Sequence, residues 1–167
     1  QWDCSLCEDK GYLEPGVLCS CYQKERLEEL FLRSGMPEAM RQFTFDNFET
    51  KRYADGEDME KKVAWCRQFV QDILQKQAGQ CLFLTGDVGR GKTHLSAAIA
   101  NAVLANGNTV LYRRASDLFD LIRQYRYEES RQLCSEMLEQ LRSCDLLVID
   151  DLGAERTTDF VIEQLVL

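Results

Sequence analysis

A glycine-rich segment in the middle of the chain constrains the fold more than any other feature of the sequence. It matches the pattern G-x-x-x-x-G-K-[ST] at every defined position. This pattern is typical of a loop whose backbone N–H groups surround phosphate oxygens, at the start of a helix whose dipole favours negative charge. The residues of this predicted phosphate loop are Gly86, Asp87, Val88, Gly89, Arg90, Gly91, Lys92 and Thr93.

The flanks of the phosphate loop agree with this interpretation. A short apolar run at 81–85 is a candidate buried strand, and a helix is expected from Lys92 onward. Lys92 offers a positive charge to the β- and γ-phosphates of a nucleotide, and the hydroxyl of Thr93 is placed to bind Mg²⁺. His94, the single histidine, completes the nucleotide-binding segment. We expect it to pack on the helix surface rather than to bind a metal.

A second motif lies near the end of the chain, where the apolar run 146–149 is followed by two carboxylates. In a phosphate-loop fold such a strand ends near the loop, so Asp150 is the candidate to hold Mg²⁺ through water. Asp151 is the candidate to orient or polarise the attacking water, with Glu155 as the alternative. The predicted catalytic residues are Lys92, Asp150 and Asp151.

Around these motifs, predicted strands alternate with predicted helices, which indicates an α/β domain with a parallel sheet. Ser116 is a candidate N-cap and Gly107 a candidate left-handed cap, and an extended linker is expected at 43–48. Strands are expected at 81–85, 109–112 and 145–149, and helices at 22–31, 61–76, 92–105, 116–125 and 129–141.

The eight cysteines fall into two sets. Four crowd the first segment with the spacing C-x-x-C and then C-x-C, namely Cys4, Cys7, Cys19 and Cys21. Four thiolates suit tetrahedral zinc in a closed structural site, and so short a segment needs a metal to fold. An iron–sulfur cluster and disulfides are the alternatives. The second set is predicted to consist of buried thiols; it contains Cys66, Cys81, Cys134 and Cys144.

The net charge of −8 argues against general binding of nucleic-acid backbones, so any such contact needs a local basic patch. Two interpretations of the one candidate patch stay open: a surface for single-stranded DNA, with tyrosine rings for stacking, or an ordinary solvated helix face, which the sequence slightly favours. The patch contains Arg113, Arg114, Arg123, Arg126 and Arg131, with Tyr125 and Tyr127. No membrane-spanning run or signal peptide is visible, so a cytoplasmic protein without a membrane partner is expected.

Several strings resemble DnaC/DnaI-type helicase loaders, which are AAA+ ATPases. They are GDVGRGKTHL at 86–95, LLVIDDLGAE at 146–155, the cysteine segment, and the runs at 34–37 and 43–48. The resemblance covers nearly the whole chain. It implies a three-layer AAA+ sandwich with sheet order 5-1-4-3-2, preceded by a zinc-binding module. The module is expected at 1–40 and the nucleotide-binding domain at 41–167.

The resemblance also implies a function. It implies ATP or ADP and Mg²⁺ at the phosphate loop, ATPase activity, and a replicative helicase as partner, contacted through the zinc-bearing part. Single-stranded DNA and further copies of the chain are implied as additional partners. By matching position, Lys92, Thr93 and Asp150 bind nucleotide and Mg²⁺, and Asp151 supports hydrolysis. Phe45 and Phe48 are expected to line the adenine side.

Only three of the five strands of that sheet order are expected in this sequence. Strands four and five, the sensor residue and the arginine finger would lie beyond Leu167, so we expect a longer natural protein and an incomplete ATPase in this chain. Two other functions remain open. A transposition helper ATPase shares the core but usually lacks the cysteine cluster, and a non-hydrolysing adaptor would use nucleotide only to stabilise its fold.

Overall fold

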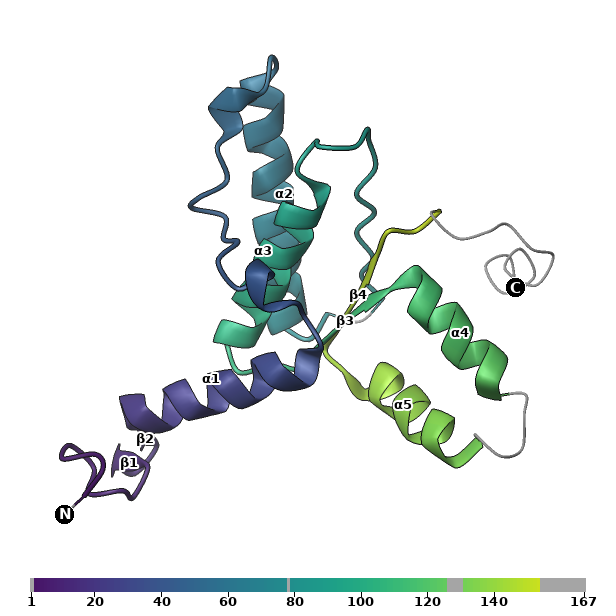
Figure 1. Cartoon of the computed structure of the whole chain (residues 1–167). Helices are drawn as coiled ribbons and strands as arrows, with labels where there is room; N and C mark the ends of the chain where they lie inside the picture. The colour runs from purple at the N-terminus through teal and green to yellow at the C-terminus, as the bar shows by residue number, and fades with distance from the viewer. Residues whose placement is uncertain (1, 78, 126–130, 154–167) are drawn as a thin grey trace.

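A computed structural model describes residues 2–77, 79–125 and 131–153 of the chain. A short parallel sheet lies at the centre, and helices extend from it in several directions (Figure 1). The elements are β1 (Tyr12–Glu14), β2 (Val17–Leu18), α1 (Ser20–Ser34), the 3-10 turns η1 (Glu38–Met40) and η2 (Thr50–Arg52), α2 (Gly56–Leu74), α3 (Lys92–Ala105), β3 (Val110–Arg114), α4 (Ala115–Tyr125), α5 (Arg131–Ser143) and β4 (Leu146–Asp150).

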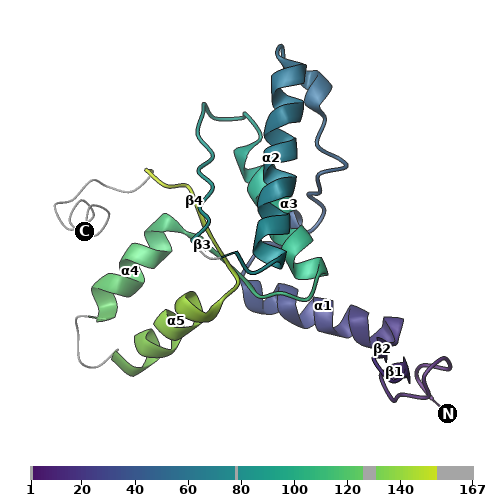
Figure 2. The same cartoon turned by 180° about the vertical axis from the view of Figure 1, so that it is seen from behind.

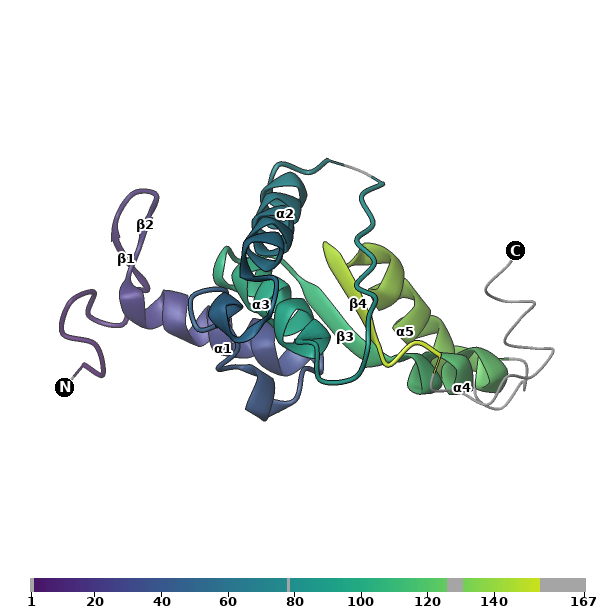
Figure 3. The ribbon, with the colours of Figure 1, turned by 90° about the horizontal axis from the view of Figure 1, so that it is seen from above.

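The central sheet is formed by β3 and β4, which pair in parallel from Val110 opposite Leu146 to Arg114 opposite Asp150. The pairing places the second and third predicted strands side by side, as the sheet order 5-1-4-3-2 requires. Helix α3 packs against both strands and α2 packs against α3, while α4 and α5 form a hairpin on the other side of the sheet (Figure 3). The predicted α/β architecture with a parallel sheet is therefore confirmed.

The strand predicted at 81–85 is not assigned as a strand in the described part of the chain. Phe83 is 72% exposed and Cys81 is exposed, so the prediction of a buried strand with a buried thiol was wrong here. In the sheet order 5-1-4-3-2 this strand pairs with strands four and five. The described residues contain neither, so its backbone groups have no ladder to join.

The core lies between α2, α3 and the sheet. Helix α3 is buried on nearly all sides, which is typical of a helix inside a domain; its buried residues are Leu95, Ala97, Ala98, Ile99, Ala100, Val103 and Leu104. Helix α2 contributes Val63, Cys66 and Val70 on one face. Cys66 is thus a buried thiol, as predicted. No helix among the described residues is long and apolar enough to cross a membrane.

Helix boundaries agree with the sequence where caps and periodicity act together. Helix α3 has the predicted bounds, and Gly107 after it has φ +78°, the expected left-handed conformation. The predicted cap at Ser116 was wrong. Helix α4 begins one residue earlier, directly after β3, and the Ser116 hydroxyl lies 3.2 Å from Asp117 Oδ1 within the first turn.

The linker at 43–48 is folded into a turn rather than extended. The backbone N–H of Thr44 donates to Asn47 Oδ1 over 2.8 Å, and the N–H of Asn47 donates back to Thr44 Oγ1 over 3.2 Å. Such reciprocal side-chain bonds compete with extended structure, because they satisfy the backbone locally. The linker is then held against α3 by Asn101, whose Nδ2 donates to the carbonyl of Phe43 over 2.8 Å.

Helix α1 connects the hairpin β1–β2, which the four clustered cysteines flank, to the core, and the hairpin lies at the far end of α1 in both views (Figures 1 and 2). The helix ends at Gly35, whose φ of +71° needs glycine. Arg26 on α1 donates to the carbonyl of Gly107 over 3.2 Å. Glu28 forms a bidentate pair with Arg41, with distances of 2.5 and 2.8 Å. Helix α1 is therefore fixed to the rest of the molecule along its length.

Candidate functional site

The phosphate loop leads directly into α3. Gly86, Gly89 and Gly91 have φ values of +139°, +77° and +79°, which glycine adopts without strain. The loop is open to solvent, and Val88 at its tip is 97% exposed. Lys92 Nζ donates to the carbonyl oxygens of Gly86 over 2.7 Å and Asp87 over 2.9 Å. The ammonium group of Lys92 therefore contacts the backbone of the phosphate loop.

The end of the phosphate loop is covered by two aromatic rings from the preceding segment. A Cβ atom at Gly91 would lie 2.5 Å from the hydroxyl of Tyr53 and 2.7 Å from Cε2 of Phe48. These two rings stack with centroids 5.6 Å apart, and the guanidinium of Arg90 lies 6.0 Å from the Tyr53 centroid. Gly91 is therefore required both for its backbone angle and for the space that the rings occupy.

His94, in the first turn of α3, packs against the linker. Its ring stacks on Phe43 at 4.7 Å and meets the ring of Phe48 edge-on at 5.1 Å, and Nε2 lies 2.9 Å from the carbonyl of Thr44. Phe45 lies elsewhere, in a groove of about 400 Å³ beside the second half of α3, with the Arg67 guanidinium 4.8 Å from its ring. Of the two phenylalanines expected at the adenine side, Phe48 alone contacts the phosphate loop among the described contacts.

The predicted magnesium carboxylate is held by two donors. Asp150 ends β4, and its Oδ2 accepts a hydrogen bond of 2.6 Å from the hydroxyl of Tyr112 on β3. Its Oδ1 accepts one of 3.0 Å from the backbone N–H of Asp151. Burial raises the pKa of Tyr112, and the bond to Asp150 raises it further. Asp151 is exposed and has φ +56°, a conformation that aspartate tolerates better than most residues.

The two nucleotide motifs meet through this tyrosine. Ser96, one turn into α3, lies with its Oγ 3.4 Å from the Tyr112 hydroxyl and donates to the carbonyl of Thr93 over 3.0 Å. The first turn of α3, which contains Thr93, therefore lies in contact with Tyr112, which donates to Asp150 at the end of β4. The alternative carboxylate, Glu155, lies outside the described residues.

The four cysteines of the first segment lie close together at the N-terminal end of α1. The sulfur atoms of Cys4, Cys7, Cys19 and Cys21 all lie within 4.8 Å of one another. Cys4 Sγ is 3.8 Å from Cys19 Sγ, and Cys7 Sγ is 3.5 Å from Cys21 Sγ. A tetrahedral zinc ion with Zn–S bonds of about 2.3 Å separates its sulfurs by about 3.8 Å, whereas a disulfide needs about 2 Å. The geometry fits one tetrahedral ion.

The C-x-C pair lies at the start of helix α1. Cys19 is the N-cap residue of α1 and Cys21 lies in its first turn, so both thiols face the positive end of the helix dipole. Backbone N–H groups of Cys7 and Leu6 lower the pKa of Cys4 to about 7. Its neighbours Cys7 and Cys19 raise the pKa of Cys21 to about 12. Four thiols this close share few negative charges unless a cation balances them.

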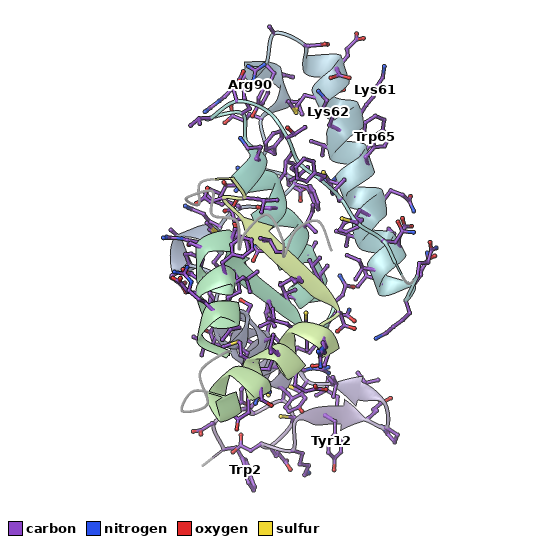
Figure 4. The ribbon with its side chains drawn as sticks, turned by 90° about the vertical axis from the view of Figure 1, so that its right-hand side faces the viewer. Trp2, Tyr12, Lys61, Lys62, Trp65 and Arg90 are labelled. Carbon is purple, nitrogen blue, oxygen red and sulfur yellow. The ribbon has the colours of Figure 1, made fainter. Side chains whose placement is uncertain are left out.

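The two sites are far apart in the molecule. In Figure 4, Arg90 of the phosphate loop lies at one end, and Trp2 and Tyr12 of the cysteine segment lie at the other. The cysteine segment also exposes several apolar side chains, which are Trp2, Leu6, Tyr12, Leu13, Val17 and Leu18.

Those arginines of the candidate patch whose side chains the structure describes do not form one surface. Arg113 is partly buried and donates to the carbonyl of Ser34 over 2.8 Å, so it is a packing residue. Arg123 is exposed and pairs with Asp120 at 2.7 Å, as on an ordinary solvated helix, and Arg114 is exposed. The remaining members of the patch lie outside the described residues or have side chains that do; they are Arg126, Tyr127, Tyr125 and Arg131, and the same holds for the thiol of Cys134.

Sequence reasoning had not singled out Tyr112. The sequence did contain a signal for this contact. A tyrosine in a buried strand needs a hydrogen-bond partner for its hydroxyl, and the next strand along the chain ends in two aspartates. What was missing was the register of the two strands. Cys19 as a helix cap was also missed, since the helix was expected to begin at residue 22 and begins at Ser20.

Known proteins match both parts of the chain. A family model described as IstB-like ATP binding protein matches residues 24–160. Phage-like element PBSX protein XkdC of Bacillus subtilis (strain 168) is 30% identical over an alignment of 185 positions, which covers 99% of this chain and 65% of XkdC. Replicative helicase loader DnaC of Escherichia coli (strain K12) is 27% identical over 162 residues, which cover 95% of this chain and 63% of DnaC.

These matches confirm the resemblance to helicase loaders and the phosphate-loop fold. The chain spans about two thirds or less of the length of these relatives, at 65% and 63%. The match to XkdC extends over the cysteine segment as well, because it covers 99% of the chain. No solved structure matches the chain significantly.

Proposed function

Because the chain belongs to the family of IstB-like ATP binding proteins, we propose that it is an ATP-hydrolysing loader that places a replicative helicase on single-stranded DNA. The observation that carries the proposal is the pairing of two sites at opposite ends of the molecule. One is a phosphate loop connected to a carboxylate at a strand end, and the other is a four-cysteine cluster on an exposed apolar segment. Relatives named as replicative helicase loaders support the same function.

In this proposal the nucleotide site is built from the two motifs. Lys92 binds the β- and γ-phosphates, the backbone of residues 86–91 surrounds them, and Thr93 and Asp150 hold Mg²⁺. Their hydroxyl and carboxylate oxygens are the hard ligands that Mg²⁺ prefers. When bound, Mg²⁺ neutralises the charge that develops on the phosphates. Asp151 orients the attacking water, and its exposed position after Asp150 leaves it free to approach solvent.

The cysteine cluster holds one zinc ion in this proposal. Sulfurs within 4.8 Å of one another suit a single centre, since the thiolates around an iron–sulfur cluster bind separate irons and stand further apart. The ion stabilises the first part of the module at 1–40, which precedes the nucleotide-binding part at 41–167. The exposed apolar side chains of the module, Trp2 and Leu6 among them, are its contact with the helicase.

The test uses the intact protein and the replicative helicase of its host. ATP hydrolysis is measured for the wild type and for Lys92→Ala, and retention of helicase on the immobilised protein is measured for the wild type and for Cys4→Ser. Cys81→Ser is the matched control, because Cys81 is an exposed cysteine outside the cluster. We expect Lys92→Ala to abolish hydrolysis, Cys4→Ser to abolish retention, and Cys81→Ser to change neither. Retention of no helicase by the wild type, with or without ATP, would overturn the proposal.

A transposition helper ATPase is the second candidate, because it would share the ATP-binding core that the family model matches. The matched residues 24–160 begin after the four cysteines, so the family model itself does not account for the cluster. Retention of a transposase instead of a helicase would select this alternative. A non-hydrolysing adaptor is a third candidate, and hydrolysis that is lost in Lys92→Ala would exclude it.

A further inference from the structure

The hydroxyl of Tyr112 is a polar group inside the core. The residue is 4% exposed and packs with the buried residues beneath α3. A buried hydroxyl without a hydrogen bond costs about 1–3 kcal/mol, so its partners define its role. Two are within reach, Asp150 Oδ2 at 2.6 Å and Ser96 Oγ at 3.4 Å.

The direction of these hydrogen bonds follows from the chemistry of the groups. Ser96 already donates its proton to the carbonyl of Thr93 over 3.0 Å. A tyrosine hydroxyl has one proton, and an ionised carboxylate can only accept. Tyr112 therefore donates to Asp150, and 2.6 Å is the length of a strong bond between a hydroxyl and a charged oxygen.

The register of β3 and β4 determines which residue of β4 the Tyr112 side chain reaches. Tyr112 is paired with Val148, and Asp150 is paired with Arg114, so the tyrosine ring reaches two residues along the neighbouring strand. Both strands belong to the described sheet, and the ring is held by the core around it. The donor is therefore fixed before any ligand arrives.

The second oxygen of Asp150 is also oriented, because Oδ1 accepts the backbone N–H of Asp151 over 3.0 Å. Each carboxylate oxygen has two acceptor sites, so one site on each remains for a metal or its water. Donors behind a ligating carboxylate commonly fix its orientation, and their loss weakens metal binding about 10- to 100-fold.

We propose that Tyr112 is a positioning residue of the magnesium site, which holds the Asp150 carboxylate in the orientation that receives Mg²⁺. This inference rests on the nucleotide function proposed above. Tyr112 touches neither nucleotide nor metal and acts through Asp150. The competing role is purely structural: the carboxylate would serve the tyrosine by satisfying a buried hydroxyl, and metal binding would not depend on it.

The test measures binding of a fluorescent ATP analogue to the intact protein as Mg²⁺ is titrated. Tyr112→Phe keeps the ring and removes only the hydroxyl. We expect the Mg²⁺ concentration at half-effect to rise about tenfold in Tyr112→Phe, while the affinity measured in excess chelator stays unchanged. Tyr22→Phe is the matched control: it removes a tyrosine hydroxyl on α1, outside the nucleotide motifs, and is expected to leave the midpoint unchanged.

A double-mutant cycle separates positioning from stability. If Tyr112 acts through Asp150, Tyr112→Phe has no further effect on the Mg²⁺ response in an Asp150→Asn background. An unchanged midpoint in Tyr112→Phe, or an equal loss of affinity with and without Mg²⁺, would overturn the inference while the nucleotide function stands. Failure of the wild type to bind nucleotide would overturn both. Should Tyr112→Phe prove unfolded by circular dichroism, the same titration of Tyr112→Leu decides.

Discussion

Arg113 on β3 donates a hydrogen bond to the carbonyl oxygen of Ser34, the last residue of α1, over 2.8 Å. The bond satisfies a carbonyl at a helix end that has no partner within the helix. Replacing Arg113 with alanine is expected to lower the free energy of unfolding by about 1–3 kcal/mol, because that carbonyl stays buried without a partner. Urea unfolding of the intact protein measures it, with the exposed neighbour variant Arg114→Ala as control. Equal midpoints for the two variants would contradict the assignment.

Gly35 gives a sharper test of the same junction. A Cβ atom there would lie 2.1 Å from Arg113 Nη1, and the φ of +71° strains any other residue. Gly35→Ala is expected to destabilise the fold by about 1–3 kcal/mol through strain and displacement of the guanidinium. Gly16→Ala is the control, since Gly16 has φ +85° but no atom within 4 Å of its Cβ position. A loss no larger in Gly35→Ala would show that the guanidinium moves away at little cost.

Asn101 fastens the linker to α3. Its Nδ2 donates to the carbonyl of Met40 over 2.9 Å and to that of Phe43 over 2.8 Å. Asn101→Ala leaves both carbonyls without this donor and is expected to cost about 2 kcal/mol in thermal or urea unfolding. Asn106→Ala is the matched control, because Asn106 makes one exposed bond, to the carbonyl of Ala102 over 2.8 Å. Similar losses in the two variants would contradict the role of Asn101.

Gly91 links the aromatic pair of the linker to nucleotide binding. An added methyl group would displace the rings of Phe48 and Tyr53 and strain the backbone before α3. Gly91→Ala is expected to weaken binding of a fluorescent ATP analogue by about tenfold, as strain of about 1.4 kcal/mol implies. Gly79→Ala, at a positive φ of +76° with open space around it, is expected to bind like the wild type. Unaltered affinity in Gly91→Ala would show that the rings do not constrain the loop.

Asp145 makes part of the stability depend on pH. Burial alone would raise the pKa of Asp145, but hydrogen bonds from Thr109 and Lys76 outweigh it and hold that pKa below its usual value. A lowered pKa stabilises the fold above about pH 4, and this contribution is lost as the pH falls through the folded-state pKa. The difference in unfolding free energy between wild type and Asp145→Asn is therefore expected to be constant near neutral pH and to shrink below about pH 4. A difference independent of pH would argue against an ionised Asp145.

The cysteine cluster is expected to bind one zinc ion per chain. Metal analysis of the intact protein gives the stoichiometry, and it is expected to fall to near zero in Cys7→Ser but not in Cys81→Ser. Removal of the metal by a chelator is expected to unfold the hairpin, because so short a segment lacks a core of its own. Iron and inorganic sulfide in the purified protein would instead identify an iron–sulfur cluster at this site.

Motifs with a fixed chemical role could be read from the sequence, and contacts between distant segments could not. The phosphate-loop motif and the bounds of α3 followed from local pattern, whereas the adjacency of the second and third strands followed from the resemblance to AAA+ proteins. The bond between Tyr112 and Asp150 depends on the register of two strands that lie far apart along the chain, so neither strand alone predicts it. Arg113 was assigned to a surface patch because its charge is visible in the sequence, whereas its acceptor at Ser34 lies far away along the chain.

The segment at 81–85 also shows that local pattern does not predict contacts with distant segments. Its apolar residues predicted a buried strand, yet a strand needs a neighbour to pair with, and none is present among the described residues. The predicted site residues of the phosphate loop, the carboxylates and the cysteines remain predictions of function.

Helix α1 sets the distance between the two ends of the molecule, because its 15 residues span about 22 Å. Arg26 and Glu28 in its middle and Ser34 at its end are each bonded to the rest of the molecule. A helix held at several points along its length acts as a strut, so it keeps the cysteine cluster at a fixed distance from the central sheet.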